Sequence, residues 1–432
     1  MTGKQDRIRM KLLSTLIPST LQGLLSKPQP EGEVDEPLEM PILRRRPRAN
    51  DLVRIACPDP TREDLTRDRH QHRAQWLVRQ ERWEEMAAAL HDADQSREMT
   101  PGAMPVAELM AFGARADVIL AAEHALFDGK PARDAPMMDG IEALEHVLEE
   151  HAGNAMIACV VAQTHIDIGW AWRGTGTEGE VPNRNRSAFA AHFDRARDIL
   201  APYEQDTTGS ALLAATRCAL LGGTGAEPRT VADRYERLID LNPANPRPMR
   251  AMGHHLLPRW HGSYAQLELE ARRTAARTEA TWGAGGYAWV QFDAITCDAQ
   301  ACANLDVPFF IEGLRDILAH RPDPHTANLL AAYCASAIGQ APSGDAASEV
   351  RAEIADCARW IVRDHMTELH PMLWAHAARG FDNNLRVRSP SRFAAAGRAD
   401  AMRIITGLFQ REIEAGKRVV FTEGRRQITL PG

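Results

Sequence analysis

The sequence predicts an all-α protein: an irregular α-solenoid of stacked antiparallel helix pairs, with a small β-hairpin at the C-terminal end. Three observations predict this fold. Apolar residues recur at helical spacing from about residue 70 to about residue 416. Short breaks rich in Pro, Asn or Gly divide several of these stretches into two helices. Strand-like alternation is scarce until the last residues, "RVVFTEGRRQITL", where two β-branched runs flank Glu423 and Gly424.

Composition narrows the functional classes. The chain has 432 residues, of which 44% are apolar and 25% charged, the balance of a soluble globular protein. A net charge of −7 argues against a nucleic-acid partner, since there is no overall basic field. The seven cysteines are odd in number and show no CxxC spacing, which argues against a disulfide framework. We therefore expect a reducing, cytoplasmic location.

The N-terminal region differs from the rest. Residues 1–48 are expected to form a flexible segment and linker, because 27–50 is rich in proline and swings from acidic to basic. Residues 4–25 combine basic and apolar side chains, so this segment could lie on a membrane surface. Two helical regions are expected to follow, N-terminal helical pairs over 49–225 and a C-terminal helical-repeat region over 226–432.

The helical pattern begins with "RAQWLVRQERWEEMAAALHDAD", where Trp76, Leu77, Trp83, Met86, Ala87 and Leu90 share helical spacing. Three later stretches, beginning at Leu144, Tyr235 and Leu314, each contain an amphipathic helix, a short break and a second helix rich in small residues. A fourth stretch, "RARDILAPYEQDTTGSALLAATRCALL", follows this pattern more loosely. Because one pair cannot bury both of its faces, successive pairs must stack.

Two of these segments resemble a known group. "YERLIDLNPANP" resembles the junction of a tetratricopeptide-type repeat, and "LLPRWHGS" followed by "PFFIEGLRDILAHRPDPHTANLLAAYCA" resembles uncharacterised bacterial tetratricopeptide-like proteins. Those proteins carry a PRWGGS-like segment between helix pairs, and here His261 stands where a glycine is expected. The resemblance covers about residues 140–340. It implies an α-solenoid and no particular activity.

The stretch "MGHHLLPRWHGS", residues 252–263, is either a metal site or a joint between two helices. His254 and His255 are adjacent and would point about 100° apart on a helix, which disfavours one shared metal ion. The joint explains each residue: Pro258 stops the first helix, Trp260 fills the joint, Gly262 makes the turn and Ser263 caps the next helix. We therefore expect Pro258, Trp260, Gly262 and Ser263 to be structural anchors.

"THIDIGWAW", residues 164–172, resembles the HxDxxW zinc-binding segment of retaining α-mannosidases, in which the His and Asp bind zinc. His165 and Asp167 would match those ligands. On a helix, however, residues two apart point about 200° apart, so the two side chains should diverge. The preferred interpretation makes Trp170 and Trp172 structural anchors between helix pairs and leaves Asp167 and Arg173 at the surface.

The sequence thus favours a non-catalytic scaffold or adaptor that binds a protein partner, with no catalytic residue, metal or cofactor. Two alternatives stay open. One is a zinc-dependent hydrolase that uses His165 and Asp167, or His254 and His261. The other is a membrane-surface adaptor docked through residues 4–25.

Overall fold

The computed structural model describes residues 52–127, 130–131, 139–174, 178–204, 209–223, 227–340, 345–381, 387–422 and 425–429. The described residues form nineteen α-helices and five short strands, so the prediction of an all-α fold is confirmed. The N-terminal segment 1–48, including the basic and apolar stretch 4–25, lies outside the described residues. Among the described helices, none combines the length and apolar character that crossing a bilayer requires.

The elements follow one another with short connections. The first half contains β1 (Val53–Arg54), α1 (Arg62–Arg79), α2 (Trp83–Gln95), α3 (Val106–Ala125), β2 (Leu126–Phe127), β3 (Lys130–Pro131), α4 (Asp139–Glu150), α5 (Ala155–Arg173), α6 (Asn183–Leu200) and α7 (Ala211–Ala219). The second half contains α8 (Pro228–Leu241), α9 (Arg247–His255), α10 (Tyr264–Arg277), α11 (Glu279–Trp282), α12 (Gly285–Cys297), α13 (Ala299–Ala303), α14 (Val307–His320), α15 (Pro324–Ala332), α16 (Asp345–Asp364), α17 (Pro371–Ala377), α18 (Pro390–Leu408), α19 (Gln410–Glu414), β4 (Arg418–Thr422) and β5 (Arg425–Thr429).

The four predicted helix pairs are present as α4–α5, α6–α7, α8–α9 and α14–α15. Their breaks are fixed by local capping. The Asn154 side chain accepts hydrogen bonds from the N–H groups of Met156 and Ile157 at the start of α5. Asp323 accepts the Thr326 N–H at the start of α15. These caps satisfy N–H groups that the helix itself leaves unpaired. Because such caps use a few residue types next to the helix start, the breaks could be predicted from the sequence.

The first helical stretch differs from its prediction. It divides into α1 and α2, because Glu81 adopts a left-handed conformation with φ of 57°. Trp76 shares the helical spacing of the core residues, yet its side chain is 53% exposed. The opposite face of α1 is the buried one, and it includes Glu63 and Gln71.

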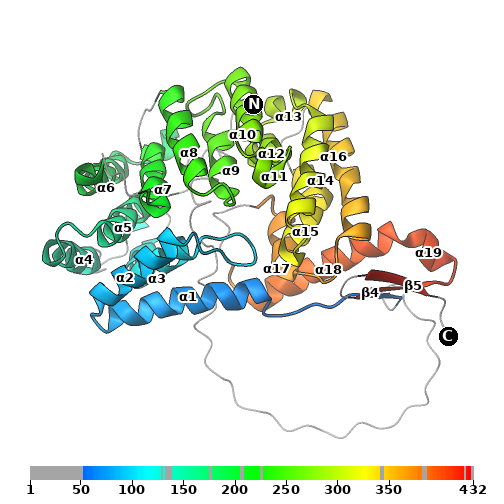
Figure 1. Ribbon diagram of the computed structural model, residues 1–432, viewed down its shortest axis with the longest axis horizontal. Coiled ribbons are helices and arrows are strands. Elements are labelled where there is room, and N and C mark those ends of the chain that lie inside the picture. The colour runs from blue at the N-terminus through cyan, green and yellow to red at the C-terminus, as the bar shows by residue number, and fades with distance from the viewer. Residues whose placement is uncertain are drawn as a thin grey trace, which may run out of the picture.

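The helices follow an arc that returns to its starting point (Figure 1), with α17 and α18 meeting the beginning of α1. A three-stranded sheet of order β1-β4-β5 closes the arc. The predicted C-terminal hairpin is confirmed as the antiparallel pair β4–β5. Sequence reasoning missed the parallel pairing of β1 with β4, in which Val53 aligns with Val419. The Leu369 N–H also donates to the Ala56 carbonyl at 2.8 Å.

A loop between α2 and α3, residues 96–105, reaches into the middle of the arc; we name it the central loop (Figure 1). Arg97 donates to the carbonyl oxygens of Gly209 and, at 2.9 Å, Leu241. The Arg321 guanidinium donates to the Pro101 carbonyl at 2.5 Å. The central loop therefore binds the α6–α7, α8–α9 and α14–α15 connections together.

Two large clusters of buried apolar side chains form most of the core, and Phe112, Ala116 and Ile119 form a third, small one. One includes residues from Ala74 to Leu220, and the other residues from Ala211 to Phe421. Val53 belongs to the second cluster although it precedes every residue of the first cluster in the sequence. Contacts between the ends of the chain thus stabilise the C-terminal half.

Candidate interaction surface

The stretch 252–263 forms the connection between α9 and α10. Helix α9 ends at His255, three residues before the exposed Pro258, which has no N–H with which to continue the helix. Gly262 has no left-handed φ; a Cβ there would collide with the carbonyl group of Leu256. The Ser263 side chain accepts the Gln266 N–H at 3.2 Å and caps α10.

The three histidines of this connection pack against Trp260 and against one another. The Trp260 Nε1–H donates to His254 Nε2 at 3.1 Å, and Trp260 itself is only partly buried. His255 Nδ1 lies 3.0 Å from the hydroxyl oxygen of Tyr235, and the His261 ring meets His255 edge-on. The arrangement is a cluster of packed rings.

This cluster should make folding sensitive to acid. Burial lowers the pKa of His255 to about 3, whereas an unfolded histidine titrates near 6.5. Its stabilisation is therefore complete above about pH 6.5 and is lost as the pH falls from there toward 3, by up to about 1.4 kcal/mol per pH unit. We expect His255→Gln to flatten the dependence of unfolding free energy on pH between 7 and 5, measured by urea denaturation. The same change at the exposed His146 is the control, and equal slopes for both variants would contradict this assignment.

His165 and Asp167 diverge as expected on helix α5. His165 Nε2 lies 2.8 Å from Glu145 Oε1, and its Nδ1 lies 2.9 Å from Nδ1 of His192. Asp167 faces another way, and its Oδ2 accepts the Arg115 Nε–H at 2.8 Å. The expectation that Asp167 lies at the surface is wrong: its exposed fraction is 8%, because Arg115 of α3 supplies a buried counter-charge.

Glu145, His165 and His192 contact one another in a row, as the groups of a proton relay do. The pKa values of the two histidines do not suit that role. Arg195 donates to both carboxylate oxygens of Glu145, so His165 shares this carboxylate with a guanidinium. Burial lowers the pKa of His165, although Glu145 opposes the shift. Burial and the neighbouring His165 lower the pKa of His192 to about 4. A general base works best with a pKa near the operating pH, so this row is poorly suited to proton abstraction at neutral pH.

The two tryptophans of this segment contact α6. Trp170 packs edge-on against Phe189, with ring centroids 4.9 Å apart, and remains partly exposed. Trp172 is buried, and its carbonyl oxygen accepts a hydrogen bond from Asn185 at 2.7 Å. Arg173 is partly buried, so it is not fully at the surface. Across the described residues, no group of three His, Cys, Asp or Glu side chains is arranged to hold a metal ion.

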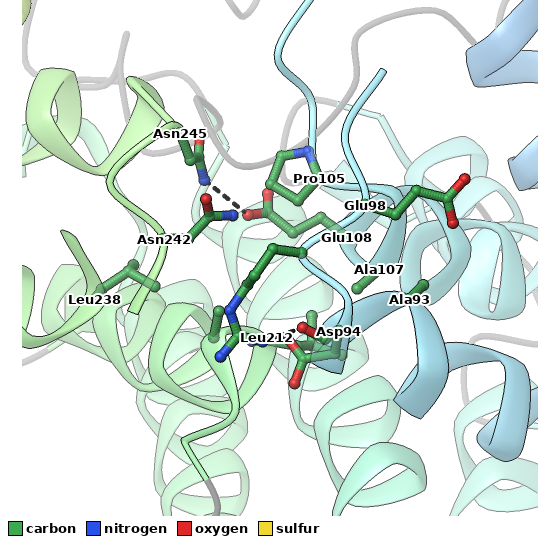
Figure 2. Close-up of a pocket in the computed structure, with 12 residues that line it drawn as sticks. Ala93, Asp94, Glu98, Pro105, Ala107, Glu108, Leu212, Leu238, Asn242 and Asn245 are labelled. Atoms are coloured by element: carbon green, nitrogen blue, oxygen red, sulfur yellow. Dashed lines mark hydrogen bonds and ion pairs between the residues drawn. The ribbon is translucent and has the colours of Figure 1, made fainter. Parts of the chain in front are cut away.

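Figure 2 shows a cavity at the seam where α2 and α3 meet α7 and the α8–α9 connection. Asp94 accepts the Leu212 N–H at 2.8 Å, and Glu108 Oε1 accepts from the Asn245 amide at 3.5 Å. Burial raises the pKa of Glu108, although Arg247 at 3.6 Å opposes the shift. The free space is about 10 Å³, close to the minimum for one water molecule. The seam therefore joins two parts of the arc and has no room for a substrate.

The outer face of α1 is the most unusual surface among the described residues. Leu65 and Trp76 are each 53% exposed, and about three helical turns separate them, so both point to the same side. Within the part of the chain that the structure describes, Leu269 on α10 is the one other large apolar residue with a comparable exposure. The guanidinium of Arg82 lies 5.0 Å from the Trp76 ring centroid and covers part of it. Exposed aromatic and aliphatic side chains on one face are typical of binding surfaces.

Among the exposed charged side chains of α1, basic ones outnumber acidic ones, of which Asp68 is the example next to Leu65. The exposed residues of α1 include Arg62, Arg69, Arg73 and Arg79. Arg79 pairs with Asp117 at 2.7 Å, whereas the other three form no ion pair within the described ranges. On a chain with a net charge of −7, this face is a local concentration of positive charge. We name the set Arg62, Leu65, Arg69, Arg73 and Trp76 the α1 surface.

The inner face of α1 explains why the apolar residues point outward. Glu63 accepts hydrogen bonds from the Thr100 hydroxyl at 2.8 Å and from the Gly102 N–H at 2.6 Å. His70 lies 3.9 Å from Glu98. Polar contacts with the central loop thus hold α1 in place, while Ala74 and Leu77 supply its apolar packing. Leu65 and Trp76 are not needed for that packing.

No protein-family model, curated protein or solved structure matches this chain. The resemblance to tetratricopeptide-like proteins therefore remains a sequence-based prediction.

Proposed function

We propose that the protein is a non-catalytic scaffold that binds a protein partner through the α1 surface. The observation that carries this proposal is the exposure of Leu65 and Trp76 beside Arg62, Arg69 and Arg73, which form no ion pair with any described residue. Burying both side chains against a partner would contribute about 1.5–3 kcal/mol each. Such residues typically dominate the affinity of an interface.

The charge of the α1 surface defines the partner's chemistry. Arg62, Arg69 and Arg73 favour an acidic surface that also presents large apolar side chains, since complementary potentials raise association rates and exclude basic competitors. A protein fits better than a lipid bilayer, because two apolar residues form too small a face for insertion. The tetratricopeptide-like interpretation and a cytoplasmic location are compatible with this proposal and form part of it.

Photo-crosslinking can test this proposal in the native host. A photoreactive amino acid at His72, an exposed position between Leu65 and Trp76, is expected to crosslink one protein through an acidic segment. The same reagent at Leu269 is the matched control, since that residue is also exposed but lies on α10. Crosslinks to lipid, or the same products from both positions, would contradict the proposal. Mass spectrometry of the crosslinked peptide separates these results.

A further inference from the structure

The α1 surface is one continuous face of its helix. Successive residues of a helix are rotated by about 100°, so the five members of the α1 surface fall within an arc of about 80°. Leu65 and Trp76 are each 53% exposed, and the three arginines of the set are exposed as well. Asp68, the acidic residue of α1 nearest to this arc, points about 60° to one side of it. The face therefore offers apolar and positively charged groups together to one ligand.

The sequence before the described residues contains a segment of complementary composition. Residues 31–40, "EGEVDEPLEM", include no basic residue, and we name them the N-terminal acidic segment. Its acidic residues are Glu31, Glu33, Asp35, Glu36 and Glu39. Val34, Leu38 and Met40 are interspersed with them. Carboxylates bind arginine through paired N–H donors, so this segment complements the α1 surface in charge as well as in apolar character.

The chain itself keeps the N-terminal acidic segment close to α1. Residues 41–51 lead from the segment to Leu52, whose carbonyl accepts the Val419 N–H at 2.8 Å beside β1. From this sheet the chain runs directly into α1 (Figure 1). An extended chain advances about 3.3–3.6 Å per residue, so residues 41–51 span up to about 38 Å. The segment can therefore reach the start of α1 and continue along this helix, which is about 27 Å long.

We propose that the N-terminal acidic segment docks on the α1 surface of its own chain and competes there with the partner. Its carboxylates pair with Arg62, Arg69 and Arg73, and its apolar side chains cover Leu65 and Trp76. The contact within the chain stands on the composition, exposure and reach given above, whereas the competition rests on the proposed function. The affinity for the partner is then reduced by the fraction of chains in which the surface is open.

The test uses the full-length protein and a fluorescent synthetic peptide of residues 30–41, followed by fluorescence anisotropy. A full-length amide variant opens the surface; it carries Glu31→Gln, Glu33→Gln, Asp35→Asn, Glu36→Gln and Glu39→Gln. We expect the amide variant to bind one peptide per chain and the unaltered chain to bind it at least about threefold more weakly. A tethered competitor at an effective concentration of about 1 mM has this effect when the peptide Kd is about 500 µM or tighter.

Further substitutions in the amide variant locate the site. Trp76→Ala should weaken peptide binding about tenfold, and Arg69→Gln up to about fivefold, the effect of losing one exposed ion pair. Leu269→Ala and Arg392→Gln are the matched controls, because both residues are exposed but lie on α10 and α18. These two changes should leave the affinity for the peptide unchanged. Circular dichroism of each variant controls for folding.

Three results would overturn the proposal. Equal peptide binding by the unaltered chain and the amide variant would show that the surface is open in the unaltered chain. Absence of binding to both would show that the segment does not recognise the surface. A dimer of the unaltered chain that the amide substitutions dissociate, measured by analytical ultracentrifugation, would assign the segment to a second copy.

None of these measurements uses the partner, so any of these three results leaves the proposed function standing. A partner whose affinity does not change in the Leu65→Ala/Trp76→Ala variant would instead contradict the proposed function. That result would leave the contact within the chain in place. The two proposals can therefore fail separately.

Discussion

Gly253→Ala is expected to lower the free energy of unfolding by about 1–3 kcal/mol, the usual cost of overfilling a packed interior. Gly253 lies on α9 where this helix crosses α12, and a Cβ there would collide with the main-chain carbonyl of Val290. A carbonyl within a helix cannot rotate away as a side chain can, so the two helices must separate. Urea denaturation of both proteins measures the difference.

The control for this prediction is Gly407→Ala. Gly407 lies within α18, and a Cβ there would meet nothing within 4 Å. Since alanine favours helix over glycine by up to about 1 kcal/mol, this variant should be as stable as the original or slightly more so. Equal destabilisation by both substitutions would show that the contact between α9 and α12 is not the cause.

Arg115→Met is expected to destabilise the protein by about 3–5 kcal/mol, because it leaves the carboxylate of Asp167 buried without its counter-charge. Both side chains are nearly inaccessible to water, and Arg115 Nε lies 2.8 Å from Asp167 Oδ2. Adding Asp167→Asn to this variant removes the uncompensated charge and should restore part of the stability. Thermal denaturation of the two single variants and the double variant measures the coupling. If the double variant is as unstable as the sum of the single ones, the pair does not act as described.

Local patterns predicted the parts of the fold that local forces determine. The α8–α9 and α14–α15 breaks were readable, since prolines and capping side chains act within a few residues. The pairing of Val53 with Val419 joins opposite ends of the chain. A strand of only two residues leaves no periodic pattern from which that pairing could be read. The role of the central loop could not be predicted either, because its contacts are also distant in sequence. Arg97 donates to the carbonyl oxygen of Leu241, 144 residues away.

The errors at individual residues have a common cause. The sequence places Asp167 at the surface because charged residues are rarely buried, yet Arg115, 52 residues earlier, supplies a counter-charge that compensates its burial. Trp76 shares helical spacing with residues such as Met86 and Leu90 that are buried, and large apolar side chains are usually inside. In the structure the inner face of α1 is partly polar, because Glu63 accepts hydrogen bonds from the central loop. Trp76 lies on the opposite, exposed face. The low hydrophobicity of α1 as a whole was the only sequence signal for the exposed Trp76, and it does not identify a particular residue.

The most direct test of the scaffold proposal is the affinity of the purified protein for the partner crosslinked at His72. Isothermal titration would compare the unchanged chain with the Leu65→Ala/Trp76→Ala variant and with Leu269→Ala. The α1 surface predicts that the double variant binds at least about a hundredfold more weakly, since about 1.5–3 kcal/mol is lost at each residue and each 1.4 kcal/mol is a factor of ten. Leu269→Ala should bind as the unchanged chain does. An unchanged affinity in the double variant, with its helical content intact, would contradict the proposal that the partner binds through the outer face of α1.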